Sequence, residues 1–147
     1  MTYEDAVTEM YDVFRLAWNS GAAAIAGAVP EVFYEGEPKE EQQPTGVIWA
    51  NVYHRNASED QATLGTPEGP GTHDYESVGL LVVRIRAPKG DGMSTARLRA
   101  LSTLVANAYR KAGGQVWYRE VTRRNRDPDE RWYTVDVTAT YEFRETV

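Results

Sequence analysis

Residues 131–145 read RWYTVDVTATYEFRE and alternate between apolar and polar side chains over their whole length. A period of two sustained this long predicts a β-strand with one buried and one solvent-facing side. The composition agrees, because β-branched and aromatic residues favour a pleated, half-buried surface. Such a strand needs other strands to pair with and an apolar layer over its buried face. We therefore expect the rest of the chain to supply a sheet and the helices that cover it.

Two segments have the helical period. In the first, Thr2 is a suitable N-cap and Asp5 the returning partner of a capping box. Its apolar face consists of Tyr3, Val7, Met10, Tyr11, Phe14, Ala17 and Trp18. This helix should end between Gly21 and Gly27. The second helix should begin at a cap formed by Asp91 or Ser94 and end before Gly113. Its buried face consists of Leu98, Leu101, Leu104, Val105, Ala108 and Tyr109.

Short runs rich in β-branched and aromatic residues predict four more strands, at 31–35, 46–54, 77–87 and 115–124. The last of these and the strand at 131–145 should form a long antiparallel hairpin. The resulting order is α-β-β-β-α-β-β in a single domain over residues 1–147. We expect an α+β fold: a two-layer sandwich of a mixed, mostly antiparallel β-sheet with two helices packed on one face.

Residues 55–76, RNASEDQATLGTPEGPGTHDYE, have low propensity for either element and predict a long loop. A loop of about 20 residues is uncommon in a compact domain and is usually functional or disordered. Two interpretations remain open: a mobile connector, or an interaction arm that orders against a partner. The candidate contact residues are Glu59, Asp60, Glu68, His73 and Asp74.

The net charge of −6 is unevenly distributed along the chain. Residues 1–83 carry 14 acids and 3 bases, whereas residues 84–147 carry 8 acids and 13 bases. Either the charges intermix in one folded body, or two opposite patches favour head-to-tail self-association. A net acidic domain disfavours binding to duplex DNA.

The turn between the last two predicted strands gathers arginines and acids, which indicates a solvated or protein-facing tip. Its candidate contact residues are Arg123, Arg124, Arg126 and Arg131.

No pattern with catalytic, cofactor-binding or metal-binding chemistry is found in the sequence. The chain has no cysteine and two histidines, and neither His54 nor His73 has neighbours at metal-ligand spacing. The nucleophile elbow and the phosphate-binding glycine loops are missing, and the acid pairs lie in polar turns. We therefore expect no enzyme activity, no cofactor and no membrane-spanning segment.

Several stretches together resemble a known family: YEDAVTEMYDVFRLAWNSGAAAIAG, VPEVFYEGEPK, GVIWANVYH, QATLG…YESVGLLVVRIRAPKGDG and GGQVWYREVTRRNRDPDERWYTVDVTATYEF. In element order and patterning they are similar to the tail terminator, or tail-completion, proteins of long-tailed bacteriophages. That family has helices packed on a mixed sheet and forms a hexameric ring that caps the tail tube. The ring stops tube polymerisation and provides the surface that joins the head.

For this chain the resemblance implies a homo-oligomeric ring, with the tail tube protein and a head–tail connector or neck protein as partners. DNA would pass through the bore without specific binding, and residues 55–76 would line that bore or contact a neighbouring ring. The protein would be located in the virion, at the head–tail junction, after assembly in the host cytoplasm. The alternatives are a head-closure or neck adaptor of the same particle, and a small α+β enzyme or ligand-binding domain with a deep pocket.

Overall fold

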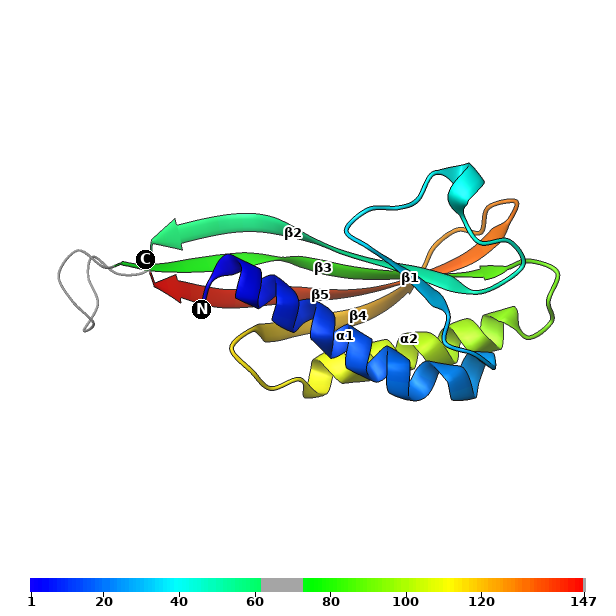
Figure 1. Ribbon diagram of the computed structural model, residues 1–147, viewed down its shortest axis with the longest axis horizontal. Helices are drawn as coiled ribbons and strands as arrows, with labels where there is room; N and C mark the ends of the chain where they lie inside the picture. Colours follow the sequence, from blue (N-terminus) through cyan, green and yellow to red (C-terminus); the bar gives the residue numbers. More distant parts are fainter. Residues whose placement is uncertain (62–72, 147) are drawn as a thin grey trace.

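The computed structural model describes residues 1–61 and 73–146, and Figure 1 shows two helices against one face of a five-stranded sheet. The elements are α1 (Tyr3–Ala26), β1 (Glu31–Tyr34), the 3-10 helix η1 (Glu40–Gln42), β2 (Trp49–Gln61), β3 (Asp74–Pro88), α2 (Ser94–Lys111), β4 (Trp117–Asn125) and β5 (Trp132–Thr146). The predicted α+β sandwich and its element order are confirmed.

The strands lie in the order β1-β2-β3-β5-β4. Only β1 and β2 are parallel, and the other three pairs are antiparallel. The predicted hairpin of the last two strands is therefore present as β4 and β5. Because the sheet places β3 and β5 at its centre, β5 has a partner strand on each side along most of its length.

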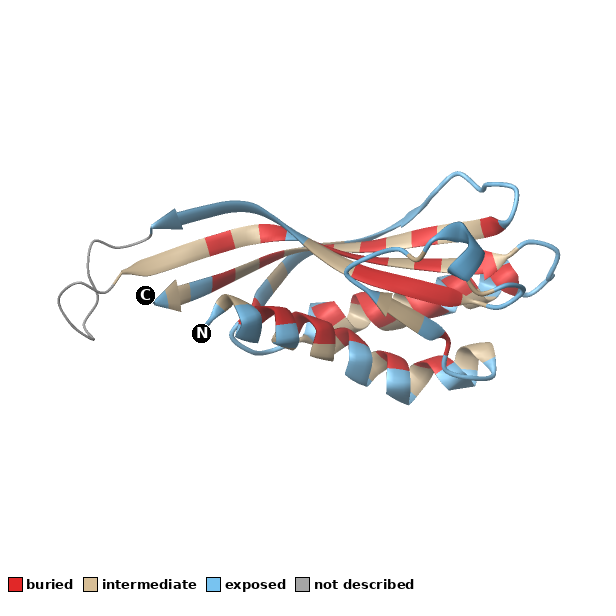
Figure 2. Ribbon diagram, turned by 45° about the horizontal axis from the view of Figure 1, so that its top comes forward, coloured by how far each residue is buried: buried red, intermediate tan, exposed pale blue. Residues whose placement is uncertain are grey.

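The alternation along β5 persists in the folded chain. Its apolar positions Val135, Val137, Ala139, Tyr141 and Phe143 are all buried, while the residues between them are partly exposed (Figure 2). All of these side chains except Ala139 belong to the same core as the buried faces of the two helices. The stretch that predicted the sheet thus also forms its central packing surface.

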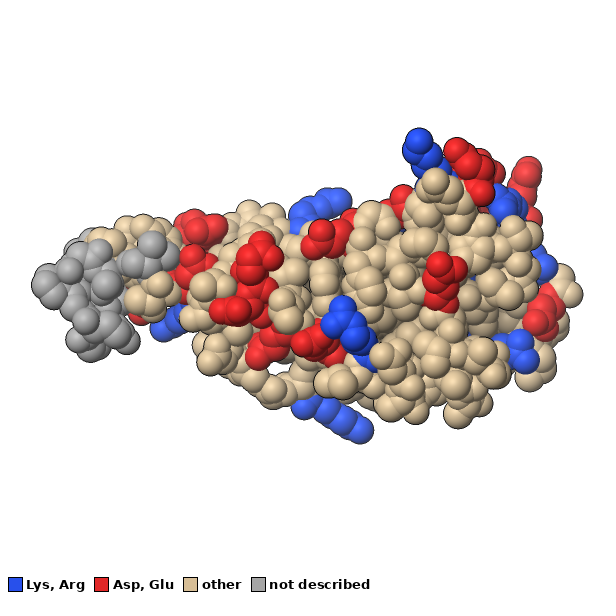
Figure 3. Space-filling model, in the orientation of Figure 1, with Lys and Arg blue, Asp and Glu red and all other residues tan. Residues whose placement is uncertain are grey.

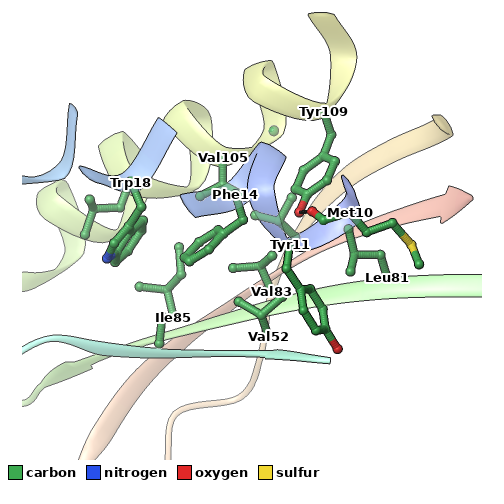
Figure 4. Packing of buried hydrophobic residues seen from close by; sticks show 14 of the residues in the cluster. Met10, Tyr11, Phe14, Trp18, Val52, Leu81, Val83, Ile85, Val105 and Tyr109 are labelled. Atoms are coloured by element: carbon green, nitrogen blue, oxygen red, sulfur yellow. Dashed lines mark hydrogen bonds between the residues drawn. The ribbon is translucent and has the colours of Figure 1, made fainter. Parts of the chain in front are cut away.

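The core lies between the helices and the sheet (Figure 4). Phe14 and Trp18 of α1 are stacked with ring centroids 5.0 Å apart. The buried hydroxyl of Tyr109 on α2 donates a hydrogen bond to the carbonyl oxygen of Met10 at 2.8 Å. Burial raises the pKa of Tyr109 well above its usual value, so this hydroxyl stays protonated. The two helices are joined by a buried polar contact as well as by apolar packing.

The predicted start of α1 is confirmed. Thr2 accepts a hydrogen bond from the Asp5 amide, and Asp5 accepts one from the Thr2 amide. The helix ends at Ala26, where Gly27 adopts the left-handed conformation with φ of 88°.

The predicted cap of α2 is wrong, because Met93 occupies the N-cap position without a side-chain bond. The Ser94 hydroxyl instead donates to the Pro88 carbonyl oxygen at 2.7 Å. The Asp91 carboxylate accepts from the Met93 amide at 2.9 Å. Both polar side chains therefore fasten the turn that precedes the helix.

The predicted loop at 55–76 is too long. Residues 55–61 belong to β2 and residues 74–76 to β3, where Glu59 pairs with Ser77 and Asp60 with Glu76. Low-propensity residues adopt the strand here because the neighbouring strand supplies a hydrogen-bonding ladder. A register shift between Asn56 and Ser58 accommodates the irregular sequence.

A second, smaller cluster packs on the other face of the sheet. The rings of Trp49 and Trp132 meet edge to face at 5.9 Å, and the Arg86 guanidinium lies over Trp49 at 4.8 Å. Arg86 also forms an ion pair with Glu37 in the connection between β1 and β2. The connection between β1 and β2 therefore packs on the sheet face that the helices leave open, at one end of the sheet.

Candidate functional site

The described ranges, 1–61 and 73–146, contain no group of three or more histidine, aspartate or glutamate side chains arranged to hold a metal ion. No helix within them has the length and apolar character needed to cross a membrane. The features described below are a projecting arm of the sheet, two groups of charged side chains and a hollow beside α1.

An arm formed by the ends of β2, β3 and β5 projects beyond the start of α1 (Figure 1). Glu59 and Asp60 lie on β2, Asp74 begins β3, and His73 immediately precedes it. The remaining candidate of this group, Glu68, lies outside the described residues. The structure thus places four of the five predicted contact residues on one arm.

Short polar contacts fix the described part of this arm. The side-chain amide of Gln61 lies 3.1 Å from Nδ1 of His73, which joins β2 to β3. The Thr146 hydroxyl donates to the Asp74 carboxylate at 2.6 Å, which joins β5 to β3. Two of the predicted contact residues are therefore held by neighbouring strands.

The arm also carries a pair of carboxylates, Glu76 and Glu142. A hydrogen bond from Glu76, with burial and the negative charge of Glu76, raises the pKa of Glu142, although Arg119 and Arg144 oppose the shift. Two carboxylates that share a site resist simultaneous ionisation. Arg144 lies 3.5 Å from Glu76 and Arg119 lies 4.0 Å from Glu142, so this pair adds little net charge to the arm.

The four arginines predicted at the hairpin tip do not form one cluster. Arg123 donates to the Thr103 hydroxyl of α2 at 2.6 Å, and Arg131 donates to Glu40 of η1 at 3.1 Å. Arg126 lies 3.5 Å from the Asp136 carboxylate of β5. Arg124 is exposed on β4. Three of the hairpin arginines therefore lie in different places: one against α2, one on the open face of the sheet and one against the β1–β2 connection.

Asp136 is the centre of a charged group on the open face. Its carboxylate accepts two hydrogen bonds from Arg84, at 2.9 and 3.3 Å, besides its ion pair with Arg126. Burial lowers the pKa of Arg84, but the bond to Asp136 outweighs it and the pKa is raised. The Arg84 side chain is only 17% exposed. This ion pair therefore serves the cohesion of β3 and β5.

Sequence reasoning missed a hollow of about 370 Å³ between the first half of α1 and β2. Its walls are Tyr3, Glu4, Val7, Tyr11, Glu35 and His54. The Tyr3 hydroxyl lies 2.7 Å from Nε2 of His54, and the Tyr11 hydroxyl lies 2.8 Å from Nδ1. The two tyrosines belong to the helical stripe predicted as core, and His54 ends the predicted strand. The packing of α1 against β2 brings the two tyrosines and His54 together.

The tautomer of His54 follows from its neighbours. The Tyr11 hydroxyl donates its proton to Glu35 at 3.5 Å, so its oxygen accepts a hydrogen bond from the Nδ1–H of His54. Nε2 of His54 then carries no proton and accepts from the Tyr3 hydroxyl. Burial raises the pKa of Tyr3 and Tyr11, and nearby carboxylates, Glu35 among them, raise it further. The hollow is therefore lined by neutral hydroxyls and rimmed by negative charge, a combination that favours a cationic group.

Acidic side chains gather over the half of the molecule where α1 begins (Figure 3). Basic side chains instead predominate in the segment from α2 to the end of the β4 hairpin strand. Residues 94–125 carry seven arginines and lysines and one acid. The uneven charge predicted from the sequence thus corresponds to separate parts of the fold.

No protein-family model matches the chain, and comparison with curated proteins finds no match. Solved structures that match this chain include two that cover most of its length. One carries no functional name; it is 18% identical, with a TM-score of 0.55 over 92% of this chain and 93% of its own. The other comes from the virion of a native gene transfer agent particle; it is 16% identical, with a TM-score of 0.47 over 92% of this chain and 91% of its own. At these identities the likeness concerns the fold alone.

Proposed function

We propose that this protein is a structural subunit of a phage tail, a tail terminator that assembles with copies of itself into a ring. The ring caps the end of the tail tube, stops its polymerisation and forms the surface to which the head is joined. The observation that carries this proposal is the arm, because it places Glu59, Asp60 and Asp74 beyond the region that the helices cover. A projecting arm offers surface to a neighbouring molecule rather than to its own core.

The fold supports the same function. Two helices on one face of a mixed sheet are the architecture expected from the sequence resemblance to tail terminators. The separation of acidic and basic segments supports contacts between different faces of identical subunits. The acidic arm suits a channel through which DNA passes, because negative side chains repel the phosphate backbone.

The site chemistry supports assembly rather than catalysis. Both ring nitrogens of His54 contact tyrosine hydroxyls, at 2.7 and 2.8 Å, so the histidine holds α1 against β2. The part-buried Arg84 and Asp136 neutralise each other. We therefore propose that the protein makes and breaks no covalent bond in its function.

Polymerisation of the tail tube protein, followed by negative-stain electron microscopy, tests this function. We expect tubes of limited length when the protein is present from the start, and unlimited growth when it is omitted. The arm variant Asp60→Lys/Asp74→Lys should lose this control of length or its attachment to the neighbouring ring. The matched variant Lys39→Glu alters a charge on the connection before η1 and should leave the effect intact.

Tubes of unchanged length with wild-type protein would contradict the terminator role. If the protein then binds the isolated portal or neck ring and not the tube, the head-closure function is supported instead.

A further inference from the structure

We propose that consecutive copies of this chain join edge to edge, the flank formed by α2 and β4 docking on the flank formed by α1, β1 and β2 of the next copy. This inference rests on the proposed ring and names the two surfaces that close it. The basic flank consists of Arg99, Arg110, Arg119, Arg123 and Arg124. The acidic flank consists of Glu4, Glu31, Glu35, Glu59 and Asp60. All ten side chains are exposed.

The two flanks lie at opposite edges of the sheet. β4 is the last strand on one side, and β1 and β2 form the other side. Each flank is nearly of one sign: Glu120 is the acid on β4, and Arg15 and Arg55 are the bases near the acidic flank. Arg15 is already paired with Asp12. A sideways translation of one copy therefore brings opposite charges together.

Both edges also retain unpaired strand backbone. Among the described residues, β4 pairs only with β5, and β1 covers β2 only from Trp49 to Val52. This leaves nine residues of β4, Trp117–Asn125, and eight residues of β2, 53–60, without an outer strand among the described residues. β2 and β4 run in opposite directions, because three antiparallel pairings separate them. A translated copy thus sets β4 antiparallel to β2, an orientation in which the two strands can extend the sheet from one copy to the next.

Charge selects this arrangement over a symmetric dimer. Two β4 edges would bring arginines against arginines, and two β2 edges would bring carboxylates against carboxylates. The heterologous contact is the one that both flanks tolerate, and such contacts close into rings or continue as filaments.

Each flank has a feature suited to anchor the other. On the basic flank the Arg123 guanidinium is held against α2 by Thr103, and Arg110 by the Val121 carbonyl oxygen at 3.1 Å. On the acidic flank the hollow beside Tyr3 and Tyr11 is rimmed by carboxylates, and aromatic faces with carboxylates suit a guanidinium. Trp117 on β4 is 54% exposed and supplies apolar surface at the same edge.

Sedimentation velocity with two charge-reversal variants tests the pairing. The first, Arg119→Glu/Arg123→Glu, removes the basic flank, and the second, Glu4→Lys/Glu35→Lys, removes the acidic flank. We expect wild type to form a ring or a longer assembly and each variant alone to be a monomer. An equimolar mixture of the two should assemble again, because each variant keeps the flank that the other needs and the two reversed flanks also carry opposite charges. Lys39→Glu should assemble as wild type does.

Circular dichroism spectra and melting curves of each variant establish that a monomeric variant is folded. A folded variant that still assembles, a mixture that stays monomeric, or a wild-type chain that is monomeric at every concentration would overturn the pairing.

Tube-length control separates this inference from the proposed function. Flank-dependent assembly without any effect on tube length would refute the terminator role alone. Capping of tubes by a ring that the flank variants still form would refute the flank pairing alone.

Discussion

Gly79 on β3 lies directly opposite Tyr141 on β5, and the tyrosine ring occupies the space that a side chain at position 79 would need. A Cβ atom there would lie 2.5 Å from Cζ of Tyr141 and would also overlap the backbone carbonyl oxygen of Arg55. The Tyr141 hydroxyl reaches across to donate to the Asn56 side chain of β2. One glycine thus lets a buried ring span three strands at the base of the arm.

Gly79→Ala should destabilise the protein by about 1–3 kcal/mol, because a rigid ring and a strand backbone must both shift to admit the methyl group. Chemical denaturation measures the change. Gly113→Ala is the matched control, since nothing lies within 4 Å of its Cβ position, and it should have little effect. A neutral Gly79→Ala would show that Tyr141 does not pack over β3.

Glu9 fastens the connection after α2 to α1. Its carboxylate accepts hydrogen bonds from the backbone amides of Gln115, at 3.1 Å, and Val116, at 2.6 Å. Glu9→Ala should cost about 1.5–3 kcal/mol in unfolding free energy, because both bonds have a charged acceptor. Asp12→Ala removes an acid from the same helix without a loop contact and should cost less. Equal losses would show that the loop is not held by Glu9.

Asp129 organises the turn before β5 and predicts an acid-sensitive contribution to stability. Slight burial raises the pKa of Asp129, but bonds from the Arg131 and Trp132 amides, at 2.8 and 2.7 Å, outweigh it and lower the pKa. A lowered folded-state pKa gives stability that is present above the ordinary value of 3.8 and lost as pH falls through the folded value.

Asp129→Asn should therefore lower Tm by about 1–3 °C at neutral pH and have no effect in strong acid. Thermal melts of both proteins across pH 7 to 2 measure this difference. A difference that is independent of pH would contradict an electrostatic role for this carboxylate.

The Glu76 and Glu142 pair should have the opposite effect on stability from Asp129, because the pKa of Glu142 is raised. A raised folded-state pKa means that ionised Glu142 is disfavoured in the folded chain, so the pair reduces stability above that pKa. Glu142→Gln should raise Tm by about 1–2 °C at pH 7, and the gain should disappear as the pH falls through the folded pKa. Glu145→Gln, on the same strand, is the comparison. A lower Tm for Glu142→Gln at neutral pH would show that the contact with Arg119 dominates.

The regular elements were predictable because they repeat a local pattern. The alternation at 131–145 and the helical stripe from Tyr3 to Trp18 each predict which face of the element is buried. Both predictions are confirmed. The cap at Thr2 was equally readable, since it depends on two residues three positions apart. Such signals involve only near neighbours in the chain.

Features that depend on pairing between distant segments were not predictable. Residues 55–61 have poor strand propensity, and β3 holds them as a strand through backbone bonds that the sequence does not display. The break in alternation on β4, at Glu120, arises from a bulge against β5.

The candidate site divides in the same way. Acidic residues in the segment at 55–76 were identified from composition, but the hollow around His54 required the packing of α1 on β2. The four arginines of the last hairpin looked like one group because they are close in sequence. In the folded chain their side chains point in different directions: Arg123 contacts α2, Arg126 contacts β5 and Arg131 contacts η1.

Cryo-EM of the assembled tail tests the central proposal most directly. We expect a single ring of this chain at the head-proximal end of the tube, with α2 and β4 of each copy against α1 and β2 of the next. A reconstruction in which the tube ends without this chain, or in which the chain is an isolated monomer elsewhere in the particle, would contradict the proposal.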